Sequence, residues 1–144
     1  YKTGMNMFFD KPWVGHGPKM FRKLCHYENY NEIVLKFDGS KYNGCSSHPH
    51  NTYVQLLAET GVIGTIIFSL GFIHVLFILI NHFTYLLVKK GKKSSNYQII
   101  INLSAIIVFW PFSPSGNLFN NWMLIIYSLS LCLYVNQYFK YNKV

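Results

Sequence analysis

His50 is the residue whose type and position in the sequence are best suited to chemistry. It precedes a segment that is predicted to be helical, because Thr52 and Gln55 have the spacing of a capping box. The positive end of a helix disfavours an imidazolium and favours nearby anions. A neutral imidazole can act as a general base. At this position His50 can act as a general base, and the helix end can hold an anion such as pyrophosphate close by.

A cluster of basic residues upstream of this histidine is suited to holding such an anion. Pyrophosphate leaves well once cations hold its charge, and Lys19, Arg22 and Lys23 lie close together in the sequence. The alternative is a solvated basic face, or contact with lipid phosphates. We count these three residues as candidate substrate-binding residues, together with Asn51 and Glu59.

Glu59 ends the predicted helix, at the edge of a long apolar stretch. It is either an ordinary carboxylate at a membrane interface, or it orients His50 or pairs with a basic residue. Gly61 and Gly64 follow it and allow the chain to turn or to pack closely where it enters the apolar stretch. The sequence leaves both interpretations of Glu59 open.

A metal site is an alternative use of the same segment. Cys45, His48 and His50 form the pattern C-x-x-H-x-H, and Cys25 and His26 are candidates for a fourth ligand. Zinc takes four protein ligands, or three and a water. The spacing is not a standard one, and the proline between the two histidines constrains it. We therefore expect no metal and no other cofactor.

The apolar residues predict the elements that position His50. Only 12% of the 144 residues are charged, against about 25% in ordinary soluble domains. Apolar segments near 61–88, 97–110 and 122–139 are predicted to be transmembrane helices, although the middle one is shorter than the roughly 20 residues that a span needs. Tyr1 to Phe9 is also predicted to be helical. The fold class is all-α and integral to the membrane, with about three transmembrane helices and an extracytoplasmic loop region.

Charged residues orient these spans. Residues 89–93 and the lysines after the third span are basic and free of acids, which predicts that they lie in the cytoplasm. Residues 1–60, which hold all five acids, and residues 111–117 then lie outside. The predicted domains are an extracytoplasmic region of residues 1–60, irregular over residues 22–48, and a membrane domain of residues 61–144. Cytoplasmic ends account for six of the 13 basic residues, so the net charge of +8 does not require a nucleic acid.

Cys25 and Cys45 lie in the region that we expect outside the cytoplasm, where disulfides persist. A bridge between them would stabilise the fold by about 3 kcal/mol in the loop-entropy model. The alternative is two free thiols. Cys132 lies in the third apolar segment and is expected to serve packing alone.

Two motifs together resemble a known family. His50-Asn51, then nine residues, then Gly61-x-x-Gly64 looks like the signature of O-antigen ligases and the related O-antigen polymerases. Upstream, the stretch from Pro12 to Phe21 has the family's Pro-x-x-Gly-x-Gly-x-x-x-Phe pattern. The motifs occur in the expected order, and the resemblance covers nearly the whole chain. The chain is therefore similar to the C-terminal part of a polytopic membrane glycosyltransferase, and we expect further spans upstream of Tyr1.

The resemblance implies a fold, a location and a reaction. The chain would be part of a C-type glycosyltransferase fold in the bacterial inner membrane, among membrane lipids, with its active site facing the periplasm. Such enzymes transfer a glycan from an undecaprenyl-pyrophosphate carrier to lipid A-core, without a metal and with inversion. By this likeness His50 deprotonates or orients the acceptor hydroxyl. Family arginines hold the donor pyrophosphate, and because Arg22 does not match one firmly, the main ones are expected upstream.

Other functions remain open at the level of sequence. An O-antigen polymerase would join repeat units, and a protein O-oligosaccharyltransferase would use Ser or Thr acceptors. A membrane subunit or glycan transporter without chemistry is the alternative outside the enzymes.

Overall fold

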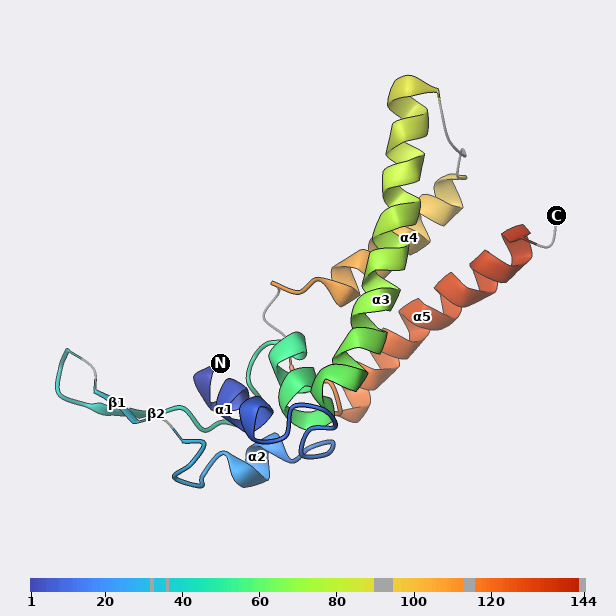
Figure 1. The fold of residues 1–144 in the computed structure, drawn as a ribbon. Helices are drawn as coiled ribbons and strands as arrows, with labels where there is room; N and C mark the ends of the chain where they lie inside the picture. Colours follow the sequence, from blue (N-terminus) through green and yellow to red (C-terminus); the bar gives the residue numbers. More distant parts are fainter. Residues whose placement is uncertain (32, 36, 90–94, 113–115, 143–144) are drawn as a thin grey trace. The chain divides into compact units, whose positions relative to one another are not determined.

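The computed structural model describes residues 1–31, 33–35, 37–89, 95–112 and 116–142. Helices dominate these ranges, so the predicted helical class is confirmed in part, with one small sheet added (Figure 1). The elements in chain order are α1 (Lys2–Asp10), α2 (Phe21–Leu24), β1 (Ile33–Leu35), β2 (Lys41–Asn43), α3 (Thr52–Val88), α4 (Asn96–Phe109) and α5 (Asn121–Asn142).

The chain divides into two compact units. The first comprises Tyr1–Ile67 and Pro111–Met123, and the second comprises Phe68–Trp110 and Leu124–Val144. Residues 111–123 therefore pack with the N-terminal region, although they follow α4 in the sequence. Every predicted site residue lies in the first unit.

The core of the first unit brings α1, α2 and the start of α3 together. Its buried residues are Met7, Phe21, Cys25 and Ala58. The prediction that residues 22–48 are irregular was wrong in two places. Phe21–Leu24 is a helical turn, and β1 pairs antiparallel with β2 so that Ile33 lies opposite Asn43.

Helix α3 begins where the sequence predicted, but a different residue caps it. The Asn51 side-chain oxygen accepts hydrogen bonds from the N–H groups of Tyr53 (2.9 Å) and Val54 (3.1 Å). The expected capping box of Thr52 and Gln55 is not formed, because Gln55 is buried and bonded elsewhere. At Gly61 the helix is interrupted by a residue with φ 66° and ψ −166°.

In the described part of the chain, two helices are long and apolar enough to cross a membrane. They are Thr52–Val88, with a mean hydropathy of 2.5, and Asn121–Phe139, with 1.2. The middle apolar segment forms α4, whose 14 residues span about 21 Å at 1.5 Å per residue, less than a ~30 Å hydrocarbon core. The expected number of three transmembrane helices is therefore not confirmed. Residues 90–94, 113–115 and 143, which the topology argument used, lie outside the described residues.

Local sequence explains where α4 begins and ends. Ser95 and Gln98 form a capping box at its start. Trp110 is extended (φ −61°, ψ 121°) because it precedes Pro111, which disfavours the helical conformation in the residue before it. Within the second unit the Phe68 ring packs edge-on against Phe109, with centroids 4.7 Å apart.

Candidate active site

The loop that follows α1 supplies donors for carbonyl groups that the break in α3 leaves without helical partners. The His16 N–H donates to the Ala58 carbonyl (3.1 Å), and the Gly17 N–H donates to the Glu59 carbonyl (2.8 Å). In a continuous helix these carbonyls would accept from residues four positions later. The irregular backbone at Gly61 removes those bonds, and the loop replaces them.

The same loop also accepts from the far side of the break. The Val62 N–H donates to the Pro12 carbonyl (2.8 Å), and the Ile63 N–H donates to the Trp13 carbonyl (3.3 Å). Buried backbone groups need such partners, because an unpaired group carries the full cost of its desolvation. Loop and helix break therefore form one interlocked backbone structure.

Two glycines make the interlock possible. Gly15 and Gly61 both have φ 66°, in the left-handed region that glycine tolerates best. An added Cβ at Gly15 would clash with the backbone of residues 59–60, and one at Gly61 would clash with the backbone of residues 13–14. The glycine motif around Gly15 and the glycine motif around Gly61 therefore pack against each other.

Glu59 is a buried carboxylate that joins α3 to α2. Its side chain is 0% exposed, and its Oε1 accepts from the Phe21 N–H at 2.8 Å. Its Oε2 accepts from Gln55 Nε2 at 2.9 Å. Both oxygens are bonded inside the protein, which favours a positioning role over the substrate contact predicted from the sequence. Glu59 holds the first residue of the short helix that carries Arg22.

Gln55 extends this buried network to the segment before α5. Its Nε2 also donates to Asn117 Oδ1 at 2.8 Å, and its Oε1 accepts from the Leu118 N–H at 2.9 Å. Asn51 makes a second tie, since its Nδ2 donates to the Pro111 carbonyl at 2.7 Å. The helix that follows His50 is therefore anchored to Pro111, Asn117 and Leu118 through two amide side chains.

His50 is exposed and lies immediately before the Asn51 cap. Its φ of 57° is left-handed, a conformation that is enriched in histidine and clusters at functional sites. The His50 ring lies against the ring of His48, with centroids 4.3 Å apart and planes at 54°. Pro49 between them is buried, so the turn that presents both rings is anchored at its centre.

A cavity of about 450 Å³ opens beside this pair of histidines. Its lining includes Lys19, Arg22, Ser47, His48, Asn117 and Trp122. Two cationic side chains, an imidazole and neutral polar groups thus face one space, and among the described lining residues there is no carboxylate. Such a lining suits an anion with several oxygens. His50 is not part of the lining. Its ring contacts the ring of His48, which is.

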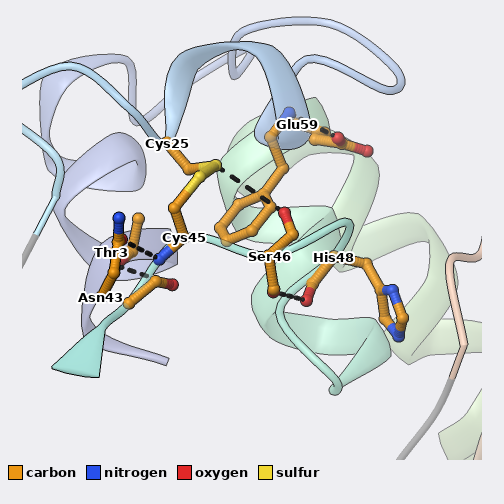
Figure 2. Close-up of a disulfide and its surroundings, with 9 residues drawn as sticks. Thr3, Cys25, Asn43, Cys45, Ser46, His48 and Glu59 are labelled. Atoms are coloured by element: carbon orange, nitrogen blue, oxygen red, sulfur yellow. Dashed lines mark hydrogen bonds between the residues drawn. A yellow bond between two sulfur atoms is a disulfide. The ribbon is translucent and has the colours of Figure 1, made fainter.

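A disulfide fixes the segment that leads to the two histidines. Cys25 and Cys45 are bridged, with Cα atoms 5.0 Å apart, and Cys25 is the C-cap of α2 (Figure 2). The Cys25 Sγ lies 3.7 Å from the Ser46 carbonyl oxygen. In Figure 2 the His48 ring points away from the bridge. The helix that carries Arg22 and the segment that carries His48 are therefore tied together covalently.

The disulfide bears on the zinc interpretation. Cys25, His26 and Cys45 come close enough to hold a metal by distance alone, but both thiols are used in the bridge. In the described part of the chain, His48 and His50 do not belong to that group. The residues present therefore do not fit the C-x-x-H-x-H site considered from the sequence.

The structure brings some of the predicted site residues together and separates others. Lys19 and Arg22 line the cavity, whereas Lys23 is exposed and does not. His48 was considered from the sequence only as a metal ligand, and it is the histidine that lines the cavity. The signal was its position two residues before His50, but its direction depends on a turn that sequence alone does not predict.

Comparisons with known proteins bear on the family that the chain resembles. Residues 1–69 match the O-antigen ligase family. The recognition made from the two motifs is thereby confirmed, and the matched segment contains the interlocked glycines and both histidines. A provisionally named polysaccharide ligase of Rickettsia felis is 30% identical over 88 residues. That similarity covers 61% of this chain and only 18% of the Rickettsia protein. No solved structure matches the chain. These matches support a ligase-like function.

Proposed function

We propose that this chain is part of an O-antigen ligase that transfers a glycan from an undecaprenyl-pyrophosphate carrier to lipid A-core. The transfer takes place on the periplasmic face of the bacterial inner membrane, without a metal and with inversion. His50 acts as the general base or orients the acceptor hydroxyl. The observation that carries this proposal is the cavity lined by Lys19, Arg22 and His48. The His50 ring lies outside the lining, against the ring of His48.

The charges of the site suit the donor. Transfer breaks the bond between the anomeric carbon and the pyrophosphate, and negative charge develops on the leaving oxygen. Lys19 and Arg22 supply positive charge for it, and Arg22 offers planar paired donors for phosphate oxygens. Inversion needs one displacement, in which His50 takes the proton of the acceptor hydroxyl while its oxygen attacks the anomeric carbon. Arginines from upstream segments would complete the donor site.

Two observations support a periplasmic site in a multi-pass membrane protein. Residues 111–123 share a unit with residues 1–67, which agrees with both segments lying on the same side of the membrane. The bridge between Cys25 and Cys45 suits an oxidising compartment such as the periplasm. Residues 1–60 would then form the periplasmic region and residues 61–144 the membrane domain, within a C-type glycosyltransferase fold.

Deletion of the gene in its own host tests the acceptor. A ligase predicts lipid A-core that lacks all O-antigen, with undecaprenyl-linked glycan accumulating. Core that carries one repeat unit would instead indicate a polymerase, and loss of protein-linked glycan with intact lipopolysaccharide would indicate a protein O-oligosaccharyltransferase. Full complementation by His50→Ala, with glycan transfer at the wild-type level, would leave the non-catalytic subunit or transporter as the better account.

A further inference from the structure

The two neighbouring histidines differ in what they face. His48 lines the cavity together with Lys19 and Arg22, whereas His50 is exposed outside the lining. The Ser47 Oγ lies 2.8 Å from His48 Nδ1, which fixes the orientation of the ring. The disulfide holds the chain just before this point against α2. His48 is therefore the better placed of the two imidazoles to bind the ligand of the cavity.

We propose that His48 binds the diphosphate of the lipid-linked donor together with Lys19 and Arg22, so that the two histidines act on different substrates. This inference rests on the proposed function. His48 donates a hydrogen bond to a diphosphate oxygen and so helps to hold the donor in the cavity. His50 acts on the acceptor hydroxyl. A diphosphate with its first sugar is an appropriate size for a cavity of about 450 Å³.

The proton and the electrons balance under this division of roles. The acceptor hydroxyl gives its proton to His50, and its oxygen forms the new bond to the anomeric carbon. The bond from that carbon to the diphosphate oxygen breaks, and its electron pair leaves with the undecaprenyl diphosphate. His48 keeps its proton and donates a hydrogen bond to the departing oxygens, so no further reactant is needed.

The contact between the rings supports the division. The ring centroids lie 4.3 Å apart. A donor bound at His48 therefore lies next to the imidazole that acts on the acceptor.

The experiment compares binding with turnover in the full-length protein reconstituted in lipid nanodiscs. The binding probe is undecaprenyl diphosphate without sugar, and turnover is measured with lipid-linked glycan and lipid A-core. His48→Ala should weaken probe binding and raise the KM for the donor about tenfold, with kcat within about threefold of wild type. His48→Gln keeps an amide donor and should recover part of the binding. His50→Ala should leave probe binding unchanged and lower kcat.

Controls separate this inference from the proposed function. His26→Ala is the matched control, since His26 is exposed and does not line the cavity. Unchanged thermal unfolding of His48→Gln shows that the fold is kept. Unchanged probe binding in both His48 variants, or a loss confined to kcat, would overturn the assignment of His48. Probe binding that depends on His48 in a protein without transfer activity would reject the proposed reaction and retain the diphosphate site.

Discussion

Gly15 and Gly61 have the same left-handed φ of 66°, and each lies directly against the backbone next to the other. One belongs to the loop after α1 and the other interrupts α3, so residues far apart in the sequence form one structural joint. The joint positions the start of α3, and with it the Asn51 cap and the turn that presents His48 and His50.

Substitution of either glycine should destabilise the protein more than its backbone conformation alone requires. Gly15→Ala costs about 1–2 kcal/mol for left-handed alanine. Gly61 has ψ −166°, in a region that essentially only glycine enters, so Gly61→Ala costs about 1–3 kcal/mol. In both variants the clash with the facing backbone adds to this. The matched control is Gly39→Ala, with φ 78° and no atom within 4 Å of an added Cβ. Thermal unfolding of the purified protein should give a clearly lower midpoint for the first two variants. Equal midpoints of thermal unfolding for Gly15→Ala and Gly39→Ala would contradict the interlock of the loop with the break in α3.

The carboxylate of Glu59 should be required for stability although it is remote from solvent. In Glu59→Gln one amide N–H₂ faces either the Phe21 N–H or the Gln55 N–H₂, so two donors meet. An unsatisfied buried donor costs about 1–3 kcal/mol. Glu28→Gln, at an exposed position, is the control. Equal unfolding midpoints for the Glu59 and Glu28 variants would show that the buried network contributes little.

The bridge between Cys25 and Cys45 should be detectable and stabilising. Mass spectrometry after alkylation should show both cysteines modified only when reductant is present. Replacement of both by Ser should lower stability by about 3 kcal/mol in the loop-entropy model, and should weaken binding at the cavity by releasing the segment before His48. Complete alkylation at both positions without reductant would refute the bridge.

The hydrogen bond of Tyr30 should stabilise the fold at neutral pH and cease to do so at strongly alkaline pH. Its hydroxyl donates to Asp10 Oδ2 at 2.7 Å, and this bond, with desolvation and the charge of Asp10, raises the pKa of Tyr30 from 10.0 to about 12. Because the folded pKa lies above the unfolded one, the contribution is fully present below pH 10 and is lost as the pH rises through about 12. Ultraviolet titration of tyrosinate should show a late-titrating contribution that is smaller by one tyrosine in Tyr30→Phe. Identical alkaline titration and unfolding of wild type and variant would disprove the effect.

The parts of this site that sequence predicted are those that depend on local patterns. The glycines and His50 could be found because left-handed turns and a helix start leave signatures in residue type and spacing. The Asn51 cap was missed because Thr52 and Gln55 offered an equally regular capping pattern. The burial of Glu59 depends on Phe21 and Gln55 meeting it from other segments. The membership of His48 in the cavity depends on Asn117 and Trp122, which are remote in the sequence. Contacts between distant segments carry no local signal.

The glycan-transfer rate of His50→Ala in the full-length protein tests the central claim most directly. Purified protein is given lipid-linked glycan and lipid A-core, and the His26→Ala protein is measured beside it. Loss of a general base predicts a fall of about 10²–10⁴-fold in kcat, with undecaprenyl diphosphate binding and thermal unfolding as in wild type. A His50→Ala protein that transfers glycan at the rate of the His26→Ala control would contradict the account.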